Sequence, residues 1–290
     1  MRWETFSKLP RGNSGGQNDA PDHSLVPPTM GARSTGGSTS CGGVSIPRLV
    51  VLADRFCCNQ KQEEFKQTTS QPNALRLSGD TLFVANEFGA VGKYDAKTGA
   101  AISPSFITGT NFFPSGLVLS GDNLFVANGE EGMVGKYDGK TGKAINVDFV
   151  PGLTVSLIGL GSLGDSLFVA DQTNNAVGEY NAKTGKLTEV LGVVSPYGIA
   201  FFGDKLFVGS TSSGTIGPYN AKTGKLINAS FFTGLTTPWQ IAILDDKLFV
   251  TNGGTGGVGE YNAKTGKVIN AAFISVPSEP VGIAVKAQSK

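Results

Sequence analysis

The sequence predicts an all-β protein, a β-propeller of four-stranded blades, in the last three quarters of the chain. Two phrases recur there among its 290 residues. The apolar triplet Leu-Phe-Val begins at Leu82, Leu124, Leu167, Leu206 and Leu248, and the turn phrase Lys-Thr-Gly begins at Lys97, Lys140, Lys183, Lys222 and Lys264. Both phrases return every 39 to 43 residues. Four strand-like runs within such a period are typical of a propeller blade.

Each copy contains four short runs that we expect to be strands. In the fifth copy they are Trp239–Leu244, Lys247–Asn252, Gly257–Asn262 and Lys267–Phe273. The runs are rich in Val, Ile, Phe and Tyr and are bounded by Gly, Asn, Asp or Pro, which indicates strands and turns. No stretch has the 3.6-residue apolar period of a helix.

Two kinds of turn recur with the strands. Gly-Asp or Asp-Asp pairs join the first strand to the second, as at Gly79–Asp80 and Asp245–Asp246, and they suit tight hairpins. The phrase Tyr-Asp/Asn-Ala/Gly-Lys-Thr-Gly joins the third to the fourth, as at Tyr180–Gly185. Its Asp or Asn can accept a backbone hydrogen bond and its last Gly can be left-handed, so we expect a hairpin with a bulge.

The regular repeats span residues 72–279, and a sixth copy starts at Pro280 and stops with the chain. A lone inner strand needs a partner. Arg48–Asp54 resembles the second-strand phrase and aligns Val50 with Leu82. We therefore expect six blades, the last an incomplete closing blade made from residues 45–71 and 280–290. Five blades is the alternative.

The segment 48–58 has a second interpretation, as the apolar remnant of a secretory signal, although it is short, charged and far from Met1. Residues 1–44 are rich in Gly, Ser, Pro and Asn, so we expect a disordered N-terminal arm before a propeller domain at 45–290. The three cysteines, Cys41, Cys57 and Cys58, precede the repeat and do not define a compartment.

Charge and composition exclude several partners. The 24 Lys and Arg residues nearly balance the 23 Asp and Glu residues, so a net charge of +1 attracts no nucleic acid. No apolar run reaches the roughly 18 residues of a membrane-spanning helix. The repeated turn lysines would form a ring on one face, but the Asp of the Gly-Asp turns offsets them. We expect a monomer with no nucleic-acid partner and no membrane span.

Three phrases resemble repeats of known propellers. They are Pro-x-Gly-Ile-Ala at Pro196–Ala200, Leu-Phe-Val-Ala-Asp at Leu167–Asp171 and Val-Gly-x-Tyr at Val177–Tyr180. They are similar to NHL-type and YVTN-type repeats, and this resemblance implies a propeller fold and an extracellular or periplasmic location. The turn Asp95–Gly99 is also similar to turns of quinoprotein propellers, whose docking tryptophan is replaced here by Ile102 or Leu187.

The irregular loops carry the candidate site. In propellers, the loops leading into the first strand and those joining the second strand to the third share one face, around the channel mouth. Here these loops vary between copies, while the turns of the opposite face repeat. The candidate ligand-binding residues are Trp239, Tyr197, Asn73, Ser115, Asp171 and Asn252. An aromatic pair with amides and hydroxyls suits a sugar or peptide. The alternative is that Trp239 and Tyr197 pack over neighbouring blades.

The repeats offer little for catalysis. Glu87, Glu130, Glu131 and Asp171 are the acidic residues of the mouth loops, and Asp171 also reads as a turn cap. The single histidine, His23, lies in the N-terminal arm, so the repeats lack a zinc ligand or base of that type. We expect no metal, no cofactor and no catalytic residue.

The predicted function is non-catalytic binding of a carbohydrate, peptide or protein by the mouth loops. Two alternatives stay open. One is a metal-dependent lactonase of the gluconolactonase type, and the other is a structural repeat array without a specialised site, which the near-identity of the copies favours. Neither the ligand nor the compartment follows from the sequence.

Overall fold

The computed structural model describes residues 49–52, 72–86, 89–109, 111–228, 231–275 and 280–285. Within these residues the regular structure is β-strand, with one single-turn 3-10 helix, η1 (Gly253–Thr255). The strands form five antiparallel sheets in chain order and one two-stranded sheet. The all-β prediction is confirmed.

The five sheets coincide with the five repeats and are called blades 1 to 5. Blade 1 contains β2 (Pro72–Ser78), β3 (Thr81–Asn86), β4 (Ala90–Asp95) and β5 (Ala101–Thr108). Blade 2 contains β6 (Pro114–Ser120), β7 (Asn123–Asn128), β8 (Met133–Asp138) and β9 (Ala144–Val150). Blade 3 contains β10 (Leu157–Leu163), β11 (Ser166–Asp171), β12 (Ala176–Asn181) and β13 (Leu187–Gly192). Blade 4 contains β14 (Pro196–Phe202), β15 (Lys205–Ser210) and β16 (Thr215–Asn220). Blade 5 contains β17 (Pro238–Leu244), β18 (Lys247–Asn252), β19 (Gly257–Asn262) and β20 (Val268–Ser275).

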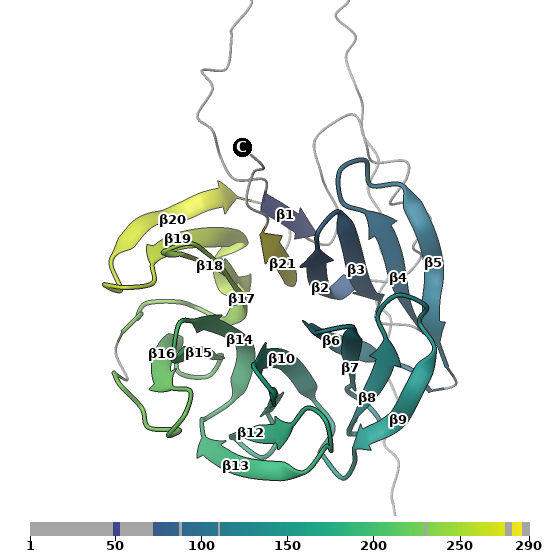
Figure 1. Cartoon of the computed structure of the whole chain (residues 1–290). Coiled ribbons are helices and arrows are strands. Elements are labelled where there is room, and N and C mark those ends of the chain that lie inside the picture. Colours follow the sequence, from purple (N-terminus) through teal and green to yellow (C-terminus); the bar gives the residue numbers. More distant parts are fainter. Residues whose placement is uncertain are drawn as a thin grey trace, which may run out of the picture. The chain divides into compact units, whose positions relative to one another are not determined.

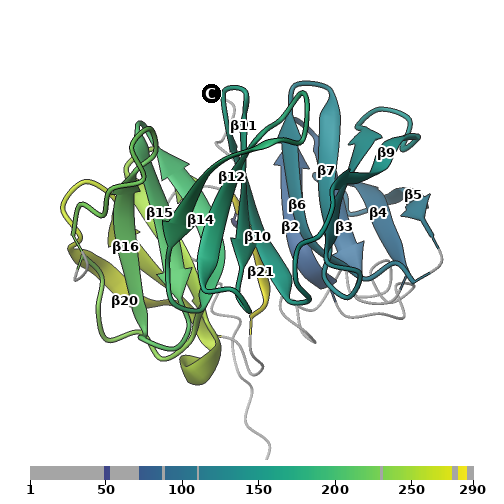
Figure 2. The same ribbon diagram turned by 90° about the horizontal axis from the view of Figure 1, so that it is seen from below.

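The blades are arranged around a central axis as a propeller. The first strand of every blade lies innermost, and the later strands follow outward (Figure 1). Neighbouring inner strands contact one another around the whole ring, from β2 through β6, β10, β14 and β17 to β21 and back to β2. Seen edge-on, the strands run between the two faces of the ring (Figure 2). The predicted propeller is confirmed.

A two-stranded closing sheet occupies the sixth place in the ring. It pairs β1 (Leu49–Leu52) with β21 (Gly282–Val285) in antiparallel register. Ile283 packs with the core of blade 5, and Ala284 packs with that of blade 1. Among the described residues the ring therefore has five blades built from full repeats, which matches the five-blade alternative, and a two-stranded closing sheet at the place of the predicted sixth blade.

The register of the closing sheet differs from the prediction by one residue. Leu49 pairs with Val285, as Leu82 pairs with Leu77 in blade 1. Leu49, and not Val50, therefore stands in the place of Leu82. The expected alignment depended on Ala53 and Asp54, which lie outside the described residues. The N-terminal arm at 1–44 and most of 45–71 also lie outside them, so the domain boundary stays a prediction.

Blade 4 departs from the four-strand prediction. Among the described residues, which leave out 229 and 230, its sheet has three strands. Two isolated bridges, Ile216 to Phe232 and Tyr219 to Leu226, stand where a fourth strand would pair. Pro218 in β16 explains the gap. Its carbonyl accepts a hydrogen bond from the Ile227 amide, so its outward edge faces the missing strand. Because proline has no N–H, it cannot donate the matching bond.

The Leu-Phe-Val triplet is buried because the blades stack face to face. Leu124, Phe125 and Val126 are all fully buried. Leu124 and Val126 pack with blade 1, while Phe125 packs with Leu157 and Leu167 of blade 3. A strand covered on both faces is apolar at every position, which accounts for a triplet without polar alternation.

The phrase Val-Gly-x-Tyr has a steric cause. Residues two apart in a strand share a face, and the Tyr180 ring lies back over Gly178. A Cβ at Gly178 would lie 2.6 Å from Cε2 of that ring. By contrast, Ile102 and Leu187, at the docking-tryptophan positions, are more than half exposed and are not inserted into a neighbouring blade.

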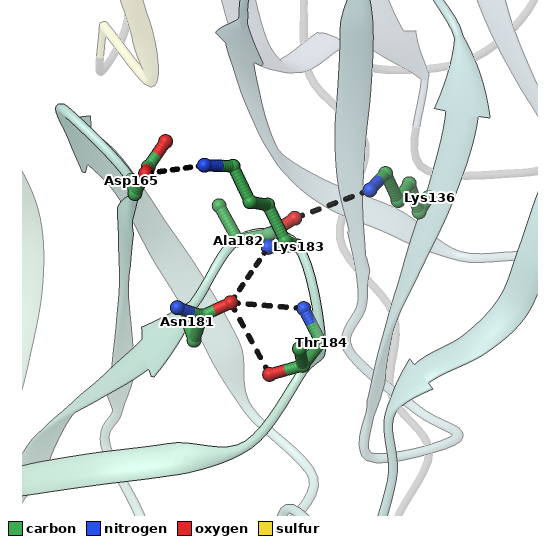
Figure 3. Close-up of polar contacts among 6 residues, drawn as sticks. All are labelled: Lys136, Asp165, Asn181, Ala182, Lys183 and Thr184. Carbon is green, nitrogen blue, oxygen red and sulfur yellow. Dashed lines mark hydrogen bonds and ion pairs between the residues drawn. The ribbon is translucent and has the colours of Figure 1, made fainter.

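The repeated turns form a regular scaffold on one face, called the turn face. In blade 3, Oδ1 of Asn181 accepts hydrogen bonds from the amides of Lys183 and Thr184, both at 3.0 Å, and from the Thr184 hydroxyl at 3.2 Å (Figure 3). The Lys183 ammonium lies 2.6 Å from Asp165 of the preceding hairpin turn. Equivalent ion pairs join Lys97 to Asp80, Lys140 to Asp122, Lys222 to Asp204 and Lys264 to Asp246. The predicted offset of the lysine ring by Asp is confirmed.

Candidate functional site

The opposite face, called the mouth face, is formed by the lead-in loops and the loops between second and third strands. Backbone hydrogen bonds join the two sets of loops. Gly129 donates to the Phe113 carbonyl at 3.1 Å, and Leu153 donates to the Gly132 carbonyl at 2.9 Å. Gly253 donates to the Thr237 carbonyl at 3.0 Å in blade 5. These bonds hold the variable loops on the ends of rigid strands.

Tyr197 and Trp239 are brought together on this face. They occupy the same position in β14 and β17, the second residue of each inner strand. Their rings stack with centroids 6.2 Å apart and planes inclined by 18°. Both side chains are half-buried, and the indole also lies against Gly253. Burial raises the pKa of the Tyr197 phenol to about 12, so it is neutral at physiological pH.

Asn73 and Ser115 occupy the equivalent positions of blades 1 and 2. The Asn73 amide donates to the Pro114 carbonyl of blade 2 at 3.5 Å. The Ser115 hydroxyl donates a short hydrogen bond to the Leu157 carbonyl of blade 3. Each side chain therefore links its own blade to the next one, at the edge of the channel mouth.

Asp171 and Asn252 end the second strands of blades 3 and 5, and both are buried. Asp171 accepts from the amide and side chain of Asn174, both at 3.0 Å, and from the Thr154 hydroxyl. Oδ1 of Asn252 accepts from the amides of Thr236 and Thr237 at 3.1 and 3.0 Å. Both residues anchor the loops around them, the role that the turn-cap interpretation of Asp171 predicts.

The mouth loops of blades 3, 4 and 5 are uncharged apart from the buried Asp171. They read Pro-Gly-Leu-Thr-Val-Ser at 151–156, Gln-Thr-Asn-Asn at 172–175, Val-Val-Ser at 193–195, Thr-Ser-Ser-Gly at 211–214, Thr-Gly-Leu-Thr-Thr at 233–237 and Gly-Gly-Thr-Gly at 253–256. Val155 and Val194 are more than half exposed there. This half of the mouth face is thus neutral, with hydroxyls, amides and aliphatic groups around the aromatic pair. Glu87, a further mouth-loop candidate, lies outside the described residues.

The central channel holds residues that sequence reasoning missed. A cavity of about 370 Å³ is lined by all six inner strands. Most of the lining is aliphatic, and Arg76 is its one charged side chain among the described residues. Gln240 and Ser162 also line it. The sequence marks each of these three residues by a difference from the residues at the equivalent inner-strand position of the other copies.

A second cavity, of about 580 Å³, lies between blades 1 and 2 away from the channel. Phe106, Phe112 and Tyr137 supply its aromatic walls, and Glu131 supplies a carboxylate. It resembles a groove left between two stacked sheets, and the candidate residues of the sequence prediction, apart from Glu131, do not line it.

No group of three or more His, Cys, Asp or Glu side chains within the described part of the chain is arranged to hold a metal ion. In the same part of the chain, no helix has the length and apolar character needed to cross a membrane.

Known proteins resemble this chain in fold. No protein-family model matches it, and no curated protein matches its sequence. A chain of the Nidogen/Laminin complex aligns with a TM-score of 0.61 at 14% identity, over 74% of this chain and 84% of that one. The computationally designed Ika8 protein aligns with a TM-score of 0.52 at 17% identity. That alignment covers 76% of this chain and 66% of the designed chain, about two thirds of its length. The NHL-type or YVTN-type assignment stays a prediction.

Proposed function

We propose that the protein is a non-catalytic binding propeller whose mouth face, at blades 3 to 5, binds an uncharged surface of a carbohydrate, peptide or protein. The observation that carries this proposal is the partly exposed stack of Tyr197 on Trp239. Stacked aromatic rings offer a flat apolar surface, and hydroxyl and amide groups beside them supply hydrogen bonds.

Several features support this choice over its alternatives. The loops that surround the stack are neutral, so an anionic or cationic ligand gains nothing there. The buried carboxylate of Asp171 is engaged by Asn174 and Thr154, which gives a lactonase-like reaction no support from this residue. One similar structure is the Nidogen/Laminin complex, and a protein partner is in keeping with it, although that likeness is one of fold.

Tryptophan fluorescence tests the proposal directly. The chain has two tryptophans, Trp3 and Trp239, so a Trp3→Phe background leaves one indole, at the candidate site. Glycan and peptide arrays supply ligands, and each hit is titrated against the fluorescence of this variant. We expect binding to shift the emission of Trp239 and Trp239→Ala to weaken affinity about 10-fold or more, as for a central aromatic contact.

The matched control is Val281→Ala. Val281 follows the lead-in proline of the sixth copy, as Trp239 follows that of the fifth, and its truncation leaves the stack intact. Retention of full affinity by Trp239→Ala, for every ligand found, contradicts the proposed site. If no glycan or peptide binds, and no captured protein partner loses affinity for Trp239→Ala, the structural repeat array is favoured instead.

A further inference from the structure

One inner-strand position differs sharply between the copies. In each inner strand one residue pairs with the phenylalanine of the Leu-Phe-Val triplet, or with Val50 in the closing sheet. These six residues occupy equivalent places around the ring. They are Val118, Gly161, Ala200, Ala242 and Ala284 in blades 2 to 5 and the closing sheet, and Arg76 in blade 1. Five of the six are small and apolar, so the packing of the ring does not require an arginine.

Arg76 is exposed to the central channel. Arg76 belongs to the lining of the 370 Å³ channel cavity, which also includes Leu117, Leu160 and Ile199. The protein around it lowers the pKa of Arg76 by desolvation, yet a guanidinium stays protonated at neutral pH. No ion pair or hydrogen bond to Arg76 exists among the described residues. A charge exposed to the channel without such a partner is available to a ligand.

Two polar side chains line the same cavity. Gln240 stands where Ala74, Gly116, Gly159, Gly198 and Gly282 stand in the other inner strands. Its backbone is bonded to the Thr251 hydroxyl, at 2.8 Å from the amide nitrogen, and within the described residues its side-chain amide has no bond. Ser162 donates to the Leu119 carbonyl at 3.1 Å, which leaves its oxygen free to accept. The cavity therefore combines one cation, one amide and aliphatic walls.

We propose that the central channel binds a small organic carboxylate, with its carboxylate on Arg76 and its hydrocarbon part against the aliphatic walls. The planar guanidinium matches a carboxylate with two parallel hydrogen bonds. A single cation beside aliphatic side chains suits a monocarboxylate better than a hydrated inorganic dianion. The cavity volume is at the lower end of the range of roughly 300–1,000 Å³ for small-molecule sites. Gln240 supplies a second polar contact on the same ligand.

Calorimetric titration of the full chain tests this site at pH 7 and constant ionic strength. The probes are sodium acetate, butyrate, hexanoate and benzoate, with hexan-1-ol and sodium sulfate for comparison. We expect saturable binding of one molecule of hexanoate or benzoate per chain. We expect hexan-1-ol, which lacks the charge, and sulfate, which lacks the hydrocarbon part, to bind about 10-fold more weakly or worse.

The key variant is Arg76→Val, because blade 2 carries Val118 at the equivalent position. We expect it to weaken carboxylate binding about 10-fold or more. Its melting temperature without ligand should stay close to that of the native chain, since Arg76 is exposed and has no ion pair or hydrogen bond among the described residues. Arg76→Gln, which keeps most of the length, should lose binding similarly, and Gln240→Ala should weaken it less.

Three results overturn the proposal. One is the absence of saturable binding for all four carboxylates. Another is equal affinity of hexanoate for the native chain and both Arg76 variants. The third is a clear fall in melting temperature for Arg76→Val, since this assigns the arginine a structural role. Trp239→Ala should retain carboxylate binding, so failure of this site and failure of the mouth-face site are distinguishable.

Discussion

The side-chain nitrogen of Lys136 in β8 donates a hydrogen bond of 3.2 Å to the Ala182 carbonyl of blade 3 (Figure 3). The same ammonium lies 4.9 Å from the centroid of the Phe149 ring and 5.6 Å from that of Phe125. Lys93 repeats the arrangement one blade earlier, with a bond of 3.3 Å to the Lys140 carbonyl. A lysine tether thus joins the outer parts of blades 1, 2 and 3.

Removal of this tether should destabilise the propeller. Lys136→Met keeps the hydrocarbon stem but loses the hydrogen bond and both cation–π contacts. We expect the free energy of unfolding, from urea denaturation, to fall by about 1–2 kcal/mol. Lys143→Met is the control, since that exposed side chain makes no such contact, and it should change stability by less than about 0.5 kcal/mol. Equal effects of the two variants would show that the tether contributes nothing.

The inner strands of blades 3 and 4 approach each other at Gly159. A Cβ there would lie 1.9 Å from the Tyr197 carbonyl oxygen. Gly159→Ala should therefore separate the two strands and lower the free energy of unfolding by about 3 kcal/mol. It should also alter the emission of Trp239, which stacks on Tyr197. Gly192→Ala meets no atom within 4 Å and serves as control; a similar loss there would contradict the steric explanation.

Asp245 has a left-handed backbone in the hairpin turn of blade 5, with φ of 55°. The four equivalent residues are glycines, Gly203 among them with φ of 57°. Asp245→Gly should relieve this strain and raise the free energy of unfolding by about 0.5–1 kcal/mol. The reverse change, Gly203→Asp, should lower it by a similar amount. Thermal unfolding of both variants checks the sign, and destabilisation by Asp245→Gly would refute the strain.

Acid should weaken the turns of blades 1 and 2 selectively. Hydrogen bonds from Thr98 and Thr141 lower the pKa of Asp95 and Asp138 respectively. A lowered folded-state pKa adds stability above the unfolded-state pKa of about 4, and that stability is lost as pH falls through the folded-state pKa. Asn181, Asn220 and Asn262 fill the same place in blades 3 to 5 without titrating.

The double variant Asp95→Asn, Asp138→Asn should consequently be as stable as the native chain or slightly less stable at pH 7. Between pH 4 and pH 2 its urea midpoint should fall less than that of the native chain. If the urea midpoints of the two proteins fall equally between pH 4 and pH 2, the stability of these turns does not respond to protonation.

Much of the fold could be predicted because short phrases within each repeat mark the individual strands. Leu-Phe-Val marks the second strand and Val-Gly-x-Tyr marks the third, and the turn residues bound them. The predicted strands Lys247–Asn252 and Gly257–Asn262 are observed with the same bounds. Among the described residues, the fourth strand of blade 4 is observed only as two isolated bridges. Pro218 removes a backbone donor there, and this loss matters only once its outward neighbour is known.

The candidate site could be predicted only in part. Tyr197 and Trp239 are placed side by side because their blades are neighbours and their strand positions are equivalent. Asn73 and Ser115 instead reach the backbone of the next blade, and Asn252 anchors its own loop. The sequence does not distinguish a polar loop residue that contacts a ligand from one that bonds to a backbone amide.

By itself the sequence determined the repeat, the class of fold and the turns, because those depend on contacts within about 42 residues of chain. The closing register of Leu49 with Val285 and the convergence of Arg76, Ser162 and Gln240 on one channel depend on the tertiary structure. These residues are distant in the chain and meet only when the ring closes. Ring closure is a property of all the blades together, since each inner strand is positioned by the two blades that flank it.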